Sequence, residues 1–159
     1  MSREAMGQVE DSKVVQFCLF RVAQDLVGID VQHVQEVLYA QALRRVPLAP
    51  SEVKGLINLR GQIVTAIDLR QMLGIVGDQR TDEHAMNVVV RYNDEAVSLR
   101  VDEAGDVIEI SDAQFEPVPA TVASQIRRLS SGALHLEEGL VLVLNIDASV
   151  RGNSEVDVA

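Results

Sequence analysis

The 159-residue chain is poor in the residues that carry most metal and redox chemistry. It has no tryptophan, 3% aromatic residues, three histidines and a single cysteine, Cys18. One cysteine excludes a disulfide within the chain, and its place in the apolar stretch VVQFCLF favours packing over redox chemistry. The histidines His33, His84 and His135 are far apart, with no cysteine or carboxylate at ligand spacing, so we expect no metal site.

Motifs for nucleotide binding and nucleophilic catalysis are also lacking. The sequence contains neither a Walker pattern nor GxGxxG, and Ser130-Ser131-Gly132 does not match the G-x-S-x-G nucleophile elbow. Acidic pairs such as Asp102-Glu103 fall at turns and strand ends, where neighbouring side chains point to opposite faces and cannot share a proton. We interpret these pairs as solvated turns and expect no catalytic residues and no cofactor.

The chain has no apolar run of about 18 residues, the length of a membrane-spanning helix. Its first residues, MSREAMGQVEDSK, lack the apolar segment of a signal peptide, so we expect a cytoplasmic protein. The formal charge of −10 is uneven: residues 1–80 hold 9 basic and 9 acidic side chains, and residues 81–159 hold 5 and 15. This balance argues against binding to nucleic acid or anionic membranes. The acidic half either steers a basic partner or is a solvated surface.

What the sequence does contain is short aliphatic segments, with 47% hydrophobic residues overall. Strands are predicted at 13–23, 26–31, 85–92, 95–102, 105–111 and 140–147, and as a pair within 55–68. The segment 33–40 fits a helix or a strand equally well. Many short strands separated by tight turns indicate an all-β fold, as barrels or a sandwich.

A polar segment at 76–85 divides the strands into two groups. We predict one β subdomain over 13–78 and a second over 84–150, between a disordered N-terminus at 1–12 and a flexible C-terminus at 151–159. Each half would be marginally stable alone, so we expect the two to pack on each other.

Proline and glycine mark the connections between these strands. Pro47 and Pro50 predict a loop, after which Ser51 is expected to begin a helical turn that ends at Gly55.

Further along, Gly61 is expected to form the turn between the paired strands of 55–68. Asp68 is expected to cap a short helix that ends at Gly74.

Two charged residues lie in apolar surroundings. Glu36 stands among Val34, Val37 and Leu38, and Arg60 follows the apolar LINL. An isolated buried charge would cost several kcal/mol, so each residue needs a partner or water. The planar fork of arginine suits a carboxylate, which makes Glu36–Arg60 a candidate pair. From the residues alone, a solvated Arg60 at a turn is an equal alternative.

The segment VQEVLYAQALRRVPLAPSEVKGLINLRGQIVTAIDLRQMLG resembles the CheW family of chemotaxis adaptor proteins. The V-x-E-V core, the Pro-x-x-Pro loop, GLINLRG and the closing DLR stand in the order and spacing of that family. The resemblance continues through VSLRVDEAGDVIEIS and GLVLVLNID and covers residues 13–150. One departure is Thr65-Ala66, where the family commonly has proline.

This resemblance implies an all-β fold of two small SH3-like β-barrels packed on a shared apolar interface, with short helical segments. Terminal strands can cross between the barrels in this family, so the predicted boundary is approximate. The resemblance also implies a non-enzymatic adaptor without cofactor. Its partners would be the regulatory domain of a CheA-type histidine kinase and the cytoplasmic tip of a chemoreceptor. It would be recruited to membrane-associated receptor arrays, where weak self-association of the adaptor is possible.

Carried over by motif, Val34, Glu36 and Arg60 are expected near a groove between the barrels where the receptor tip docks. Gly55, Gly61 and Asp68 are expected to be structural turn and cap residues. Two alternatives remain: an adaptor of a twitching or gliding pathway, and a small enzyme that uses Glu36, Arg60 and Asp68 as acid–base and oxyanion groups.

Overall fold

The computed structural model describes residues 13–41, 43–49, 53–75 and 85–149. The predicted terminal segments, nearly all of the predicted linker and Ser51 lie outside these ranges. Ten strands occur in the described part of the chain: β1 (Val14–Val22), β2 (Asp25–Asp30), β3 (Val34–Tyr39), β4 (Val53–Leu59), β5 (Gln62–Asp68), β6 (Met86–Tyr92), β7 (Glu95–Val101), β8 (Glu103–Ser111), β9 (Ser130–Leu136) and β10 (Gly139–Leu144). The short helical elements are η1 (Val31–His33), α2 (Leu69–Met72), η2 (Asp112–Gln114) and α3 (Ser124–Arg128). Among the described residues no helix has the length and hydropathy to cross a membrane.

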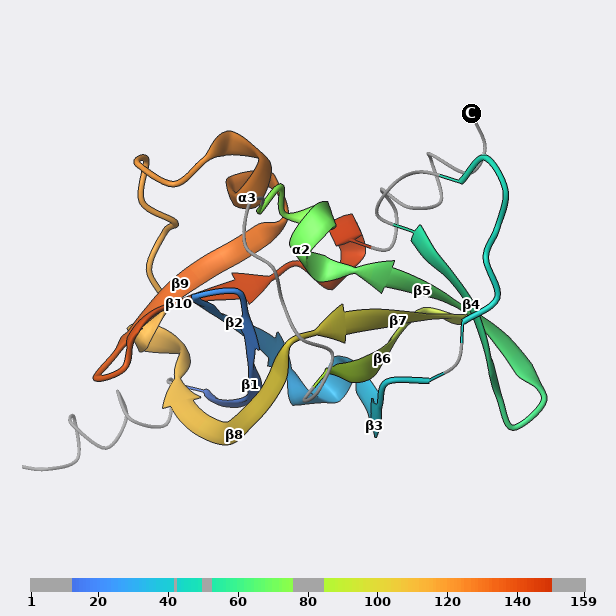
Figure 1. Ribbon diagram of the computed structural model, residues 1–159. Coiled ribbons are helices and arrows are strands. Elements are labelled where there is room, and N and C mark those ends of the chain that lie inside the picture. The colour runs from blue at the N-terminus through green and yellow to red at the C-terminus, as the bar shows by residue number, and fades with distance from the viewer. Residues whose placement is uncertain (1–12, 42, 50–52, 76–84, 150–159) are drawn as a thin grey trace, which may run out of the picture.

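The strands form two five-stranded sheets. Sheet A has the order β8-β1-β2-β10-β9 and sheet B the order β3-β6-β7-β5-β4. In Figure 1 sheet A lies on the left and sheet B on the right. Each sheet contains one parallel strand pair, β2–β10 in sheet A and β5–β7 in sheet B, and its other pairs are antiparallel. The two sheets therefore have the same arrangement of strand directions.

The predicted division at 76–85 does not describe the sheets. Strands β1 and β2 belong to the first half of the sequence, yet they pair with β8 and β10 from the second half. Sheet B, by contrast, is built from the consecutive strands β3 to β7. The correction has a physical reason: strand pairing depends on which edges meet in space, and a polar linker in the sequence carries no information about that.

The largest buried cluster takes side chains from both sheets. Phe20 and Ile29 of sheet A pack with Val88 and Leu99 of sheet B, and the last two are 0% exposed. Two smaller clusters lie within sheet A and within sheet B. The expected shared apolar interface is therefore present, and we name it the shared core.

Two local predictions are resolved by tertiary pairing. The ambiguous segment 33–40 is mostly strand: β3 follows the single turn of η1 and pairs with β6. The helical turn predicted to end at Gly55 is wrong over its described part, because Val53–Leu59 is strand β4 and Gly55 lies inside it. Pairing of β4 with β5 outweighs the local preference of this short segment.

The short helix predicted after Asp68 is confirmed as α2. The Asp68 side chain accepts a hydrogen bond from the Arg70 N–H at 3.0 Å. At the other end, Gly74 has φ = +76°. The Ile75 N–H donates to the Arg70 carbonyl at 2.9 Å and the Gly74 N–H to the Gln71 carbonyl at 3.1 Å, which is a Schellman motif.

Candidate partner-binding site

The β4–β5 hairpin places Arg60 at an exposed tip. Arg60 and Gly61 both have positive φ, +51° and +89°, as a two-residue type I′ turn requires. The Gly61 N–H donates to Asn58 Oδ1 at 2.8 Å, which fixes the turn. The hairpin projects on the side of sheet B away from sheet A (Figure 1). The predicted turn role of Gly61 is confirmed.

Arg60 and Glu36 form the candidate pair. A salt bridge joins Arg60 Nη2 to Glu36 Oε2. β3 and β4 are the two edge strands of sheet B, so this contact links opposite edges of a curled sheet. The Arg60 side chain is 70% exposed and that of Glu36 is 20% exposed. Because Arg60 is so open to solvent, the ion pair contributes only about 0–1 kcal/mol, and the Arg60 side chain is the accessible member of the pair.

Val34 lies apart from the ion pair. It is half-buried and packs against the shared core, next to the junction of the two sheets. The register of β3 on β6 shifts between Val34 and Glu36, so Gln35 is the extra residue of a bulge and accepts a hydrogen bond from Arg91 Nε at 2.9 Å. The first residues of β3 therefore connect the junction, at Val34, to the ion pair, at Glu36.

Exposed apolar side chains lie on β3 and on the hairpin, and those of β3 are on the strand face opposite to Glu36. Val37 and Tyr39 on β3 are 37% and 77% exposed, and Ile63 on the hairpin is 60% exposed. Sequence reasoning treated Val37 only as the apolar neighbour of Glu36, and it missed Tyr39 and Ile63. The alternation of half-buried and exposed positions along an edge strand was the available signal.

Gly55 is structural, in a role different from the predicted turn. It has φ = +152°, and a Cβ at this position would lie 2.5 Å from the Arg44 carbonyl oxygen. The missing side chain lets Arg44 and Leu56 exchange two backbone hydrogen bonds of 2.9 and 2.8 Å. Gly55 thus allows the loop before β4 to lie directly against that strand.

Asp68 is buried at the end of β5 and serves as the cap of α2. It is 1% exposed, and the Lys54 Nζ lies 3.6 Å from its Oδ2. β5 begins just after the Arg60-Gly61 turn and ends at Asp68, which separates the two by about 20 Å along the strand. The enzyme alternative requires Asp68 to lie beside Glu36 and Arg60. The structure does not bring these three residues together.

Sequence reasoning missed an ionic contact that connects the two sheets. Arg70 Nε on α2 lies 2.8 Å from Asp102 Oδ2, and the same oxygen accepts a 2.6 Å hydrogen bond from the Ala23 N–H. Ala23 belongs to the β1–β2 turn of sheet A. The Asp102 side chain is only 15% exposed, so its interpretation as a solvated turn residue is wrong.

The remaining candidates for chemistry are few. Within the described ranges, no three side chains of histidine, cysteine, aspartate or glutamate are placed to hold a metal ion. Burial raises the pKa of the Cys18 thiol, and the negative charge of Asp30 adds to this effect. Cys18 packs against the shared core, as its sequence context predicted.

The fold places the chain in a known class of scaffolding proteins. The crystal structure of the scaffolding protein TtCheW from Thermoanaerobacter tengcongensis is similar over 84% of this chain and 86% of that chain, with a TM-score of 0.76 and 25% identity. This similarity confirms the all-β fold of two SH3-like barrels. The model of the CheW-like domain matches residues 16–153, so the chain belongs to the CheW family of chemotaxis scaffold proteins.

Curated relatives agree with this assignment. The chemotaxis protein CheW of Klebsiella aerogenes is 29% identical over 92% of this chain and 84% of its own length. That of Helicobacter pylori is 27% identical over 88% and 84%. That of Bacillus subtilis is 35% identical over 65% and 66%.

Proposed function

We propose that this chain is a non-enzymatic adaptor that couples the cytoplasmic tips of chemoreceptors to a CheA-type histidine kinase. The observation that carries the proposal is the exposed Glu36–Arg60 ion pair, placed at the edge of a barrel in a CheW-family fold. The pair adds little to folding, and the opposite, exposed face of β3 carries the apolar side chains of Val37 and Tyr39. Such a surface suits recognition, in which apolar anchors supply affinity and charges set the register.

A docking region along β3 is supported by the shape of the molecule. A depression of about 600 Å³ is lined by Val14 and Gln16 of β1, Glu109 of β8, and Val31 and Gln32 of η1. η1 leads directly into Val34, so this depression lies where the chain passes from sheet A to sheet B. We propose that a helical receptor tip docks here and extends along β3 to Glu36 and Arg60.

The adaptor role sets two physical requirements. Each contact can be weak, because an array of receptors and kinases multiplies weak contacts through effective concentration. Coupling also requires the adaptor to favour one state of the kinase, since tethering alone would not shift its activity. We propose the cytoplasm as the location, with recruitment to membrane-associated arrays.

Co-purification tests the proposal. The full chain, the regulatory domain of the cognate kinase and a receptor-tip fragment are mixed in pairs and together, and a ternary complex is expected. Binding to neither partner would refute the adaptor role. In a deletion strain, lost chemotactic spreading with intact surface motility is expected, whereas lost twitching or gliding would assign the adaptor to the alternative pathway.

A further inference from the structure

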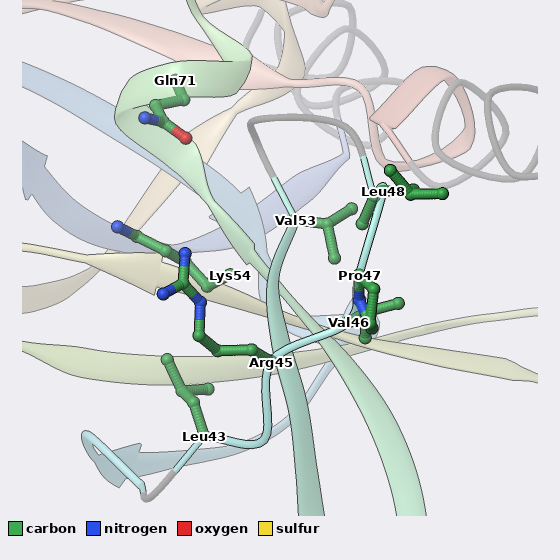
Figure 2. Close-up of a pocket in the computed structure, with 9 residues that line it drawn as sticks. Leu43, Arg45, Val46, Pro47, Leu48, Val53, Lys54 and Gln71 are labelled. Atoms are coloured by element: carbon green, nitrogen blue, oxygen red, sulfur yellow. The ribbon is translucent and has the colours of Figure 1, made fainter.

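A second surface lies at the opposite end of β4 from the hairpin tip. A cavity of about 720 Å³ is lined by the aliphatic side chains of Leu43, Val46, Leu48 and Val53 and by the cations Arg45 and Lys54. We name it the basic groove. Figure 2 shows Arg45 and Lys54 on one side of it and Leu48 and Val53 on the other. The groove therefore has a cationic part and an aliphatic part.

Leu48 is held in solvent in an unfavourable conformation. Its relative exposure is 103%, and its φ is +63°, in the left-handed region. That region costs an L-residue with a Cβ about 1–2 kcal/mol. Because the side chain is fully exposed, its burial does not offset this cost. An exposed aliphatic side chain at a strained position points to a contact made outside the folded chain.

The cationic part has unused capacity for an anion. Among the described residues, Arg45 makes no ion pair or side-chain hydrogen bond, and the only ionic partner of Lys54 is the buried Asp68, at 3.6 Å. The Gln71 amide lines the same cavity and can donate a further hydrogen bond. Two cations on one wall favour an acidic occupant, and this local charge is opposite to the formal charge of −10 on the whole chain.

Distance separates this groove from the Glu36–Arg60 pair. Lys54 and Arg60 stand six positions apart along β4 and its turn, which corresponds to about 20 Å in an extended strand. A segment bound in the groove would leave the pair uncovered. The two surfaces can therefore hold two different partners at once.

We propose that the basic groove binds an acidic segment of a partner protein that carries aliphatic side chains. Its carboxylates would contact Arg45 and Lys54, and its aliphatic side chains would pack on Val46 and Leu48. A small inorganic anion would leave Leu48 exposed, and a basic segment would meet like charge. The inference is independent of the receptor contact proposed for the ion pair.

The test uses a fluorescein-labelled, end-blocked peptide of alternating glutamate and leucine, measured by fluorescence anisotropy against the full chain. Arg45→Glu is expected to weaken binding at least about tenfold, and Leu48→Ser by a similar factor. Arg44→Glu is the matched control, because it makes the same charge change one residue away and Arg44 does not line the groove. The affinity of the Arg44→Glu protein for the peptide is expected to stay within about twofold of that of the unchanged protein.

Three results would overturn the inference. If Arg44→Glu and Arg45→Glu reduced peptide affinity equally, binding would reflect general electrostatic attraction and not a defined site. If an alternating lysine–leucine peptide bound with the same affinity, the groove would have no preference for acidic segments. Self-association that Arg45→Glu abolishes would make a second copy the occupant. Circular dichroism verifies folding, and Arg45→Gln replaces Arg45→Glu if the latter is unfolded. Amide NMR shifts at Val46, Lys54 and the Gln71 side chain are expected to mark the groove.

Discussion

Arg60 is conspicuous in the sequence, yet its replacement is expected to change the stability of the fold very little. Its guanidinium is largely solvated and its partner Glu36 lies on the other edge of the sheet, so little stability depends on it. Gly55 is the reverse case: it is inconspicuous in the sequence, yet a backbone oxygen occupies the space where its side chain would be.

Arg60→Ala is expected to lower the free energy of unfolding by no more than about 1 kcal/mol, because the pair is exposed. It should weaken receptor-tip binding much more. Urea denaturation and a pull-down measure the two effects. The exchange Glu36→Arg with Arg60→Glu keeps the pair but reverses its direction, so it should retain stability without restoring binding. An unfolded Arg60→Ala protein would instead make the residue structural.

Gly55→Ala is expected to destabilise the protein by about 1–3 kcal/mol, since it combines an unfavourable φ with a clash against Arg44. Gly61→Ala is the matched control: its φ is also positive, but nothing lies within 4 Å of the added Cβ. Thermal unfolding should therefore show a clearly larger loss of stability for Gly55→Ala than for Gly61→Ala. Equal losses of stability in the two variants would mean that the positive φ alone, without the clash against Arg44, causes the destabilisation.

Cys18 gives a prediction that depends on pH. A raised pKa means that less thiolate is present at pH 8 than in an unperturbed cysteine, and the thiolate is the reactive form. Alkylation of the folded protein by iodoacetamide should therefore be slower than that of the same protein in urea, and should increase toward more alkaline pH. Equal rates in both states would contradict the burial of this thiol.

At the scale of elements, local signals were reliable where a few neighbouring residues determine the conformation. The Arg60-Gly61 turn, the Asp68 cap and the Gly74 stop were all predictable, since each depends on backbone φ or on a hydrogen bond within a few positions. The helical turn assigned before Gly55 failed because strand pairing with β5 determines that segment. The segment 33–40 stayed ambiguous for the same reason.

The cap itself can be tested. Asp68→Ala removes the hydrogen bond to the Arg70 N–H and leaves Lys54 without its carboxylate, and it should cost at least about 1–2 kcal/mol. Asp68→Asn preserves the capping oxygen but removes the charge, so it separates the two contributions. Denaturation in urea, with unchanged m-values, is the measurement. A neutral result for Asp68→Ala would show that α2 does not depend on this cap.

At the scale of the whole molecule, the interleaved sheets make a clear prediction about fragments. The fragment 13–78 contains β1 and β2 without β8, β9 and β10, so it should show no cooperative thermal transition. The fragment 31–102 contains all five strands of sheet B and should retain more β structure, although it loses six of the fourteen buried residues of the shared core. Far-ultraviolet circular dichroism and melting compare them. A folded 13–78 fragment would contradict the observed strand pairing.

The family resemblance came from an ordered set of motifs, and it correctly indicated two SH3-like barrels and a shared core. The Glu36–Arg60 pair was only one candidate among many acids, because nothing along the chain shows that β3 and the hairpin tip meet. The sequence did not predict the role of Asp102. Its position indicated a solvated turn residue, but its side chain joins α2 to the β1–β2 turn.

By itself, the sequence determined the all-β class, the positions of most strands and turns, and the family, since these depend on local backbone chemistry and on motif order. Only the tertiary structure decided which strands share a sheet, that Arg60 pairs with Glu36 while Val34 faces the shared core, and that Arg45 and Leu48 border one groove. Those features depend on contacts between residues far apart in the chain. Many pairings are compatible with the same local preferences, and the one adopted is selected by burial of the apolar faces against each other.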